Sequence, residues 1–369
     1  MTAMATASVG VQVDGISKRY LHRVKGEIYA ARDVRLDVLP GEFLTLLGPS
    51  GCGKTTTLRM IAGFEKPDAG RVRFDGQDVT DLPANQRNIG FVFQNYALFP
   101  HLSVFENVAY GLRVRGLPAD VAARRVDDVL ALVGLAGYEQ QFSAQLSGGE
   151  QQRVALARAI VIEPRVLLFD EPLSNLDAKL RVQMRQEIRA LQRRLGITTV
   201  YVTHDQEEAM AVSDRIVVMD HGSVVQQGTA EDLYYRPASQ FVAGFIGRVN
   251  LIAGTAMKTP DGRPGVAALG TVIAAANLPA GLALGDAVQL LLRPEALTIA
   301  RDGEPVALRA TVVSCTFLGE KIEYLLRCGG EILQSVRYNA GPAEVVPEGA
   351  EVWLRVAEES VNVLPGKRA

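Results

Sequence analysis

Two kinds of hydrophobic pattern divide the chain into two parts. In the first part, short apolar runs such as residues 43–47 alternate with segments of helical periodicity such as residues 118–142. Residues 248–369 instead contain short strands in which apolar and polar positions alternate, separated by turn residues. The first pattern predicts an α/β domain, and the second predicts a small, barrel-like all-β domain. Composition shifts near residue 236, where we expect the boundary.

The first part contains a glycine-rich loop between an apolar strand and a helix. Residues 48–55 fit the pattern G-x-x-x-x-G-K-[ST]. Small residues let backbone N–H groups surround phosphates, and the start of the following helix adds positive potential. We expect Lys54 to bind the β- and γ-phosphates of a nucleotide and the Thr55 hydroxyl to bind Mg²⁺. A simple glycine-rich turn is the alternative, and the matching strand and helix disfavour it. The phosphate-binding residues are Gly48, Pro49, Ser50, Gly51, Cys52, Gly53, Lys54, Thr55 and Thr56.

A second apolar run, residues 166–169, ends in the acids Asp170 and Glu171. At the C-terminal edge of a parallel strand, an aspartate lies beside the Mg²⁺ of a bound nucleotide. Its neighbour points to the other face, so we interpret Glu171 as the base that activates water. His204 follows the predicted strand 198–203, and at the same sheet edge it would donate a hydrogen bond to a γ-phosphate.

A Ser-Gly-Gly sequence begins a helix about ninety residues after the phosphate loop. Ser147, Gly148, Gly149 and Glu150 would leave backbone N–H groups free for an anion. Nothing local joins them to the phosphate loop, so a simple helix cap remains an alternative. Tyr20, in a predicted turn, is a candidate for stacking on adenine, with ordinary packing as its alternative.

Composition limits the class of protein and its environment. The 369 residues include 48% hydrophobic and 22% charged residues, which suits an ordinary globular core. A net charge of −2 gives no general attraction to nucleic acid. Cys52, Cys315 and Cys328 are too few for a disulfide framework and indicate a reducing compartment. The N-terminus lacks the features of a signal peptide, and no segment suits a membrane span, so a membrane role would require a partner.

Taken together, the motifs resemble the nucleotide-binding subunit of an ATP-binding cassette (ABC) transporter over residues 10–245. The phosphate loop, Q-loop, signature, Walker B end, D-loop and switch histidine occur in the family's order and spacing. They are residues 48–55, Gln94, residues 146–150, Asp170-Glu171, Ser174-Asn175-Leu176-Asp177 and His204. Tyr20 falls at the family's adenine-stacking position. Asn175 replaces the commoner alanine, and we expect no functional consequence.

The resemblance implies a P-loop NTPase cassette, with a mixed sheet and a helical subdomain at about residues 100–160. It implies ATP hydrolysis with Mg²⁺ in a head-to-tail homodimer. Each ATP would lie between the phosphate loop of one subunit and residues 147–149 of the other. The implied roles are Glu171 as general base, His204 on the γ-phosphate, Thr55, Gln94 and Asp170 at Mg²⁺ and water, and Asp177 in coupling the two sites.

The C-terminal part, residues 246–369, is similar to the transport-associated OB-type (TOBE) domain of importer ATPases. The similarity rests on residues 247–250, 292–295 and 317–319. It implies a bacterial importer in the polyamine, ferric-iron and aminoethylphosphonate branch. The subunit would lie at the cytoplasmic face of the inner membrane, bound to transmembrane permease subunits that a periplasmic or lipid-anchored solute-binding protein supplies. We expect this domain to be dispensable for the chemistry and to sustain the dimer or regulate it.

Two further interpretations concern interactions with macromolecules. The segment after Gln94 is rich in aromatic residues, and we expect Tyr96, Phe99, Phe105 and Tyr110 to pack internally or to form a surface that receives the permease. The alternative to an importer is a soluble ABC ATPase that acts on nucleic acid or ribosomes, since OB-type folds can bind nucleic acid. The short insert before the signature and the lack of a basic cluster disfavour it, and the solute itself is not readable from the sequence.

Overall fold

The computed structural model describes residues 8–24, 26–275, 278–279, 281–300 and 308–366. It divides the chain into two compact units, Met1–Ala230 and Glu231–Ala369. Each unit has its own hydrophobic core, so each is described separately. No helix in the described ranges combines the length and apolar character that a membrane span requires.

A six-stranded sheet forms the centre of the first unit, in the order β10-β9-β3-β8-β7-β6. Its strands are parallel except β10, which pairs antiparallel with β9. Every residue of β3, β7 and β8 is buried, as expected for parallel strands that are covered on both faces. The strands are β3 (Phe43–Leu47), β6 (Ile89–Val92), β7 (Val166–Asp170), β8 (Thr198–Thr203), β9 (Arg215–Asp220) and β10 (Ser223–Gly228).

The register of this sheet brings the predicted motifs to one edge. Leu47 lies opposite Thr203, and Asp170 lies opposite Val202, so β3, β7 and β8 end together. The phosphate loop, the two acids and His204 therefore leave the sheet side by side. Parallel strands place their loops in this way, and ligands bind outside their carboxyl ends.

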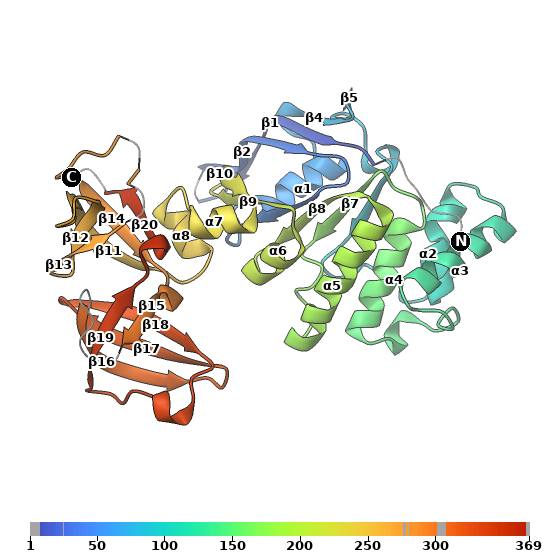
Figure 1. The fold of residues 1–369 in the computed structure, drawn as a ribbon. Helices are drawn as coiled ribbons and strands as arrows, with labels where there is room; N and C mark the ends of the chain where they lie inside the picture. Colours follow the sequence, from blue (N-terminus) through green and yellow to red (C-terminus); the bar gives the residue numbers. More distant parts are fainter. Residues whose placement is uncertain (1–7, 25, 276–277, 280, 301–307, 367–369) are drawn as a thin grey trace. The chain divides into compact units, whose positions relative to one another are not determined.

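An antiparallel sheet in the order β2-β1-β4-β5 covers α1 (Lys54–Ala62) on the side away from the central sheet (Figure 1). Leu58 and Ile61 of this helix are fully buried in a cluster that includes Val34 of β2 and Val200 of β8. The helix that carries the phosphate loop is thus fixed between two sheets. The strands are β1 (Val11–His22), β2 (Gly26–Val38), β4 (Ala69–Phe74) and β5 (Gln77–Asp78).

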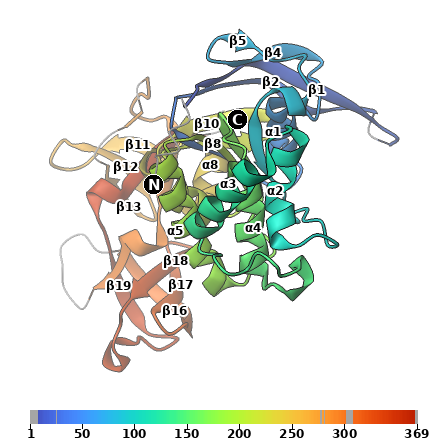
Figure 2. The ribbon, with the colours of Figure 1, turned by 90° about the vertical axis from the view of Figure 1, so that its right-hand side faces the viewer.

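Helices cover the other face and one end of the central sheet (Figures 1 and 2). A second cluster of buried side chains, among them Val108, Val126, Leu156 and Met184, holds α2 to α5 together. Two of these helices begin with capping boxes, Ser103 with Glu106 and Ser147 with Glu150. The helices are α2 (Val104–Val114), α3 (Ala119–Leu132), α4 (Gly148–Ile160), α5 (Ala178–Leu195) and α6 (Gln206–Val212).

The strands that the alternating pattern predicted in the second unit form two antiparallel five-stranded sheets. Their orders are β13-β12-β11-β14-β20 and β15-β19-β16-β17-β18, and Leu290, Tyr324 and Leu354 lie in their shared core. The strands are β11 (Asn250–Lys258), β12 (Pro264–Ala268), β13 (Thr271–Ala274), β14 (Ala287–Leu292), β15 (Leu297–Ala300), β16 (Leu308–Phe317), β17 (Lys321–Cys328), β18 (Glu331–Tyr338), β19 (Glu351–Val356) and β20 (Val361–Pro365).

Two short helices, α7 (Ala230–Tyr235) and α8 (Gln240–Phe245), precede these strands and are held by a buried arginine. Arg293 donates hydrogen bonds to the carbonyl oxygens of Tyr234 at 3.0 Å and Ala243 at 2.8 Å. Its guanidinium also lies 4.2 Å from the Tyr234 ring centroid. Both helices therefore pack with the β-strands of the second unit.

Candidate nucleotide-binding and hydrolysis site

The phosphate loop curls around the ammonium group of Lys54. Lys54 Nζ donates to the carbonyl oxygens of Gly48 at 2.7 Å and Pro49 at 3.0 Å, and the side chain is buried. A Cβ at Gly53, where φ is 102°, would lie 1.9 Å from the Ala30 carbonyl oxygen. Only glycine fits there, which leaves the backbone free to approach a phosphate. The structure therefore has the cradle that the motif predicts.

Thr55 and Asp170, two of the predicted metal ligands, are in contact. Thr55 Oγ1 donates to Asp170 Oδ1 at 2.9 Å, although 115 residues separate them. Burial raises the pKa of the Asp170 carboxyl, and the Thr55 hydrogen bond lowers it in part. A hydroxyl and a carboxylate are oxygen ligands of the kind that Mg²⁺ prefers when phosphates and water complete its shell. The residues present thus fit this ion.

Glu171 and His204, the predicted base and γ-phosphate contact, also meet. His204 Nδ1 lies 3.1 Å from Glu171 Oε2. Glu171 has a left-handed backbone with φ of 46°, and its N–H donates to the Val202 carbonyl oxygen at 3.0 Å. This contact ties the residue after β7 to β8. Both side chains line a hollow of about 30 Å³, which has room for a water molecule.

Three polar residues that the sequence analysis did not single out surround this hollow. Arg181 Nη2 donates to the Leu176 carbonyl oxygen at 3.0 Å, and its Nη1 donates to Asp205 Oδ2 at 3.4 Å. The buried Glu208 accepts hydrogen bonds from Tyr201 Oη at 3.0 Å and Thr203 Oγ1 at 2.8 Å. They join the D-loop to the loop that carries His204. Charged residues on a helix usually face solvent, so periodicity gave no signal for them.

The signature residues contact one another in this single chain. Ser147 N donates to Glu150 Oε2 at 2.7 Å, and Ser147 Oγ caps α4 by accepting from Glu150 N. The helix-cap alternative is therefore correct as a local description. Within the described part of the chain, no hydrogen bond joins residues 147–150 to the phosphate loop.

The remaining predicted site residues occupy loops or strand ends. Gln94 follows β6 at the same sheet edge with an exposed side chain, and its carbonyl oxygen accepts from Asn175 Nδ2 at 2.9 Å. Asp177 caps α5 by accepting from Leu180 N at 2.9 Å. Tyr20 is 46% exposed but lies in β1, paired with Ile28, so the prediction of a turn there is wrong. β1 and β2 continue to pair as a two-stranded hairpin past Ser17, where the pairing of β1 with β4 ends.

The aromatic segment after Gln94 is only partly a surface. Tyr96 is 6% exposed and belongs to the core of the helical region, and Phe105 packs partly against that core. Tyr110 is 47% exposed and lies 4.8 Å from the half-buried Phe99 between ring centroids. The interpretation of Tyr96 as a surface residue is therefore wrong, because its ring belongs to this core.

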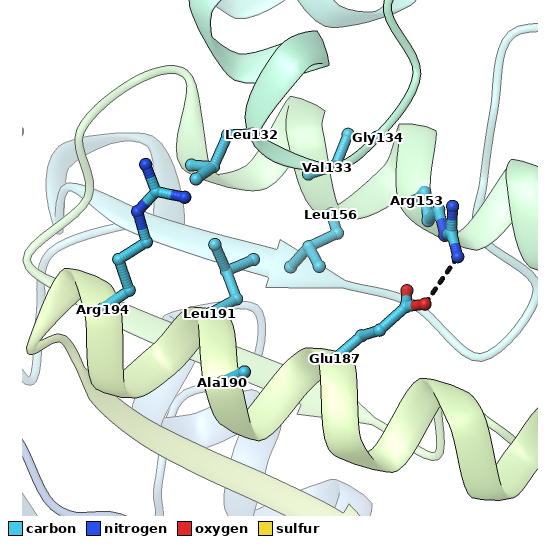
Figure 3. A pocket seen from close by; sticks show the side chains of 9 residues that line it. All are labelled: Leu132, Val133, Gly134, Arg153, Leu156, Glu187, Ala190, Leu191 and Arg194. Atoms are coloured by element: carbon cyan, nitrogen blue, oxygen red, sulfur yellow. Dashed lines mark hydrogen bonds and ion pairs between the residues drawn. The ribbon is translucent and has the colours of Figure 1, made fainter. Parts of the chain in front are cut away.

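A larger hollow lies between α3, α4 and α5, and no predicted site residue lines it (Figure 3). Its volume is about 310 Å³. Leu132, Val133, Leu156 and Leu191 provide apolar walls, and an ion pair of 2.6 Å between Arg153 and Glu187 crosses one end. This hollow results from packing among the helices and is separate from the nucleotide site.

Replacing Asp170 by asparagine is expected to stabilise the nucleotide-free protein at neutral pH. The raised pKa means that the stability contribution of Asp170 is greatest at low pH and is lost as pH rises through that pKa. Asparagine stays neutral and keeps the oxygen that accepts from Thr55. We expect the melting temperature to rise, because the variant removes a partly buried charge.

Thermal unfolding over a pH series tests this expectation. The difference between variant and wild type should shrink as the pH falls through the raised pKa, because the wild-type carboxyl then also becomes neutral. Mg²⁺ should enhance the stabilisation by ATP in the wild type and not in the variant. A difference that is independent of pH would contradict the assigned cause.

Comparisons with known proteins agree with this geometry. Residues 31–174 match the ABC transporter family, and residues 290–364 match the TOBE domain. The chain is 46% identical to the spermidine/putrescine import ATP-binding protein PotA of Rubrobacter xylanophilus, over 98% of this chain and 95% of that protein. It is 52% identical to the Fe(3+) ions import ATP-binding protein FbpC of Rhizobium etli, over 81% of this chain and 84% of that protein.

Solved structures of ABC cassettes resemble about three fifths of the chain. A dimeric bacterial ABC transporter cassette is 33% identical, with a TM-score of 0.54, and the match covers 59% of this chain and 98% of the cassette. CbiO1 from Clostridium perfringens, part of the ABC transporter complex cbiONQ, is 30% identical with a TM-score of 0.56, and the match covers 61% and 90%. The chain therefore belongs to the ABC transporter family, as the ATP-hydrolysing subunit of an importer with a C-terminal TOBE domain.

Proposed function

We propose that this subunit energises the uptake of a small solute of the polyamine or ferric-iron class. The names of PotA and FbpC, which the chain resembles over most of its length, support these two classes. The observation that carries the hydrolytic role is the Glu171–His204 pair, which lies beside a hollow of water size. Glu171 would polarise the attacking water, and His204 would contact the γ-phosphate.

The proposed binding roles follow the cradle and the oxygen ligands. Lys54 would exchange its loop carbonyl partners for the β- and γ-phosphates of ATP. Tyr20 offers an exposed ring for adenine. Thr55, Asp170 and Gln94 would hold Mg²⁺, which when bound neutralises charge on the phosphates.

We propose a head-to-tail homodimer with ATP at the interface. Ser147 and Gly148 are exposed at the N-terminus of α4, where free N–H groups favour an anion. No such anion site reaches the phosphate loop within the described residues of one chain, whereas a second subunit could supply it. The similar cassette structure is dimeric, which supports this arrangement. Asp177, beside the signature region, would couple the two sites.

The proposed partners are transmembrane permease subunits, supplied by a periplasmic or lipid-anchored solute-binding protein. The subunit would then lie peripherally at the cytoplasmic face of the bacterial inner membrane. The test is ATPase activity of the subunit co-purified with its permease in proteoliposomes. We expect stimulation by the solute-loaded binding protein and no response to oligonucleotides, with Lys54→Ala as the inactive control. Stimulation by oligonucleotide alone would favour the soluble ATPase alternative.

Shortened chains are expected to show the division of labour between the two domains. Every residue assigned to ATP lies between Tyr20 and His204, so chains ending at residue 230 or 245 should bind ATP with similar affinity to the full chain. The shortened chains should dimerise only when ATP is present. In the absence of ATP, the full chain should self-associate more readily than the shortened chains. Light scattering and nucleotide titration measure both properties.

Chains ending at residues 230 and 245 test two alternative positions of the domain boundary. The resemblance to the ABC cassette ends at residue 245, whereas contacts divide the chain after Ala230. If α8 needs its Arg293 contact, the chain ending at 245 should be the less soluble one. A folded short chain that cannot bind ATP would mean that the second domain builds part of the site.

A further inference from the structure

The backbone immediately after Gln94 adopts a conformation that needs external support. Tyr96 and Ala97 have φ values of 61° and 49°, two consecutive residues in the left-handed region. Residues other than glycine, asparagine and aspartate rarely adopt it, and usually not in succession. The carbonyl groups of Tyr96 and Ala97 therefore cannot take part in the hydrogen-bond pattern of a β-strand and need other donors.

One side chain of the signature helix binds both of these carbonyl groups. Arg158 of α4 donates from Nη2 to the Tyr96 oxygen and from Nη1 to the Ala97 oxygen, each at 2.7 Å. Its guanidinium also lies 5.7 Å from the ring centroid of Phe99. Burial lowers the pKa of Arg158, so the carbonyl oxygens compensate a desolvated cation. The planar guanidinium can hold two acceptors at once, whereas a lysine ammonium cannot reproduce this fork.

The D-loop binds the same segment from its other end. Asn175 Nδ2 donates to the Gln94 carbonyl oxygen at 2.9 Å, across 81 residues of sequence. An alanine at this position could not make the bond. The expectation that Asn175 has no functional consequence is therefore revised.

We propose that Arg158 and Asn175 are positioning residues, which fix segment 94–97 between the signature helix and the D-loop. The inference rests on the proposed function, in which both elements face the partner subunit and the segment leads to the permease. Residues 147–149 begin α4, and Arg158 lies later on the same rigid helix. A shift of α4 or of the D-loop on closure around ATP would thus move the segment through three hydrogen bonds to its backbone.

Asn107 holds the next part of this segment and limits where motion can occur. It is buried, and its amide binds Phe99 at both the N–H and the carbonyl, at 2.8 and 3.1 Å. It also donates to the carbonyl oxygens of Leu102 and Ser103. Residues 99–103 are therefore fixed to α2. A movement of residues 94–97 would be transmitted through them to α2 and to the surface proposed to contact the permease.

The test compares Arg158→Lys and Asn175→Ala, singly and combined, in the full subunit with its permease in proteoliposomes. The readout is the ratio of ATPase with solute-loaded binding protein to basal ATPase. For Arg158→Lys we expect basal ATPase within about twofold of wild type and a roughly tenfold loss of stimulation, within the range of allosteric coupling. The double variant should lose less than the two single losses combined, because both act on one segment. Arg165→Lys, which alters a half-buried arginine paired with Asp75, is the matched control.

Each outcome bears on the inference. An unchanged ratio in Arg158→Lys and Asn175→Ala would overturn it. An equal fall of basal and stimulated rates, with a lower melting temperature, would make the contacts merely structural and would also overturn it. A wild-type subunit that no binding protein stimulates would instead refute the proposed import function, so the two failures are distinguishable.

Discussion

Glutamine in place of Glu171 is expected to slow ATP hydrolysis by about a hundredfold or more, the usual contribution of a general base. The side chain retains its shape and can still bond His204, which lies 3.1 Å away, but it can no longer accept a proton from water. The phosphate loop and the Thr55–Asp170 contact do not involve this carboxylate, so ATP and Mg²⁺ should bind as before. Binding without hydrolysis should trap the ATP-bound dimer.

Single-turnover hydrolysis and size-exclusion chromatography with ATP and Mg²⁺ measure the two effects. Glu207→Gln is the matched control, because Glu207 lies nearby on α6 with an 84% exposed side chain that forms an ion pair with Arg185. The control should hydrolyse ATP normally and should not accumulate as an ATP-trapped dimer. Near-normal turnover by the Glu171 variant would remove this residue from the role of base.

Local chemistry in the sequence was enough to predict the centre of the site. Continuous apolar runs such as residues 166–169 indicated strands covered on both faces, and the β7 pattern confirms it. Parallel strands end at one sheet edge, so the sequence order of the motifs predicted that Asp170, Glu171 and His204 lie together. The Thr55–Asp170 and Glu171–His204 contacts agree with that expectation.

Contacts between distant side chains and backbone could not be predicted in this way. Arg158 and the Ala97 carbonyl are 61 residues apart, and nothing in helical periodicity distinguishes this arginine from one that faces solvent. Tyr96 is buried and has a positive φ that local propensity disfavours. Such features depend on tertiary packing, which overrides local preference.

Aspartate in place of Gly149 is expected to prevent ATP-dependent dimerisation while one subunit still binds ATP. In the proposed dimer the backbone at this position lies near the γ-phosphate of the partner's nucleotide, and two negative groups in a desolvated site repel strongly. The phosphate loop lies elsewhere in the chain and keeps its own contacts, such as Lys54 with Gly48. Hydrolysis should therefore fall to near background, although nucleotide affinity changes by less than about twofold. Equilibrium binding of a fluorescent ATP analogue and sedimentation with ATP measure the two quantities.

The alanine variant separates charge from size at this position. A Cβ at Gly149 would lie 3.0 Å from two methyl carbons of Leu180, a tight contact that a flexible side chain can relieve by a small shift. Gly149→Ala should therefore fold and retain measurable ATP-dependent dimerisation, whereas Gly149→Asp should lose it even at high salt, because a buried repulsion is poorly screened. If both variants failed equally, crowding against α5 would explain the loss. If Gly149→Asp also lost nucleotide binding as a monomer, ATP would not be shared between two subunits, and the head-to-tail dimer would have to be abandoned.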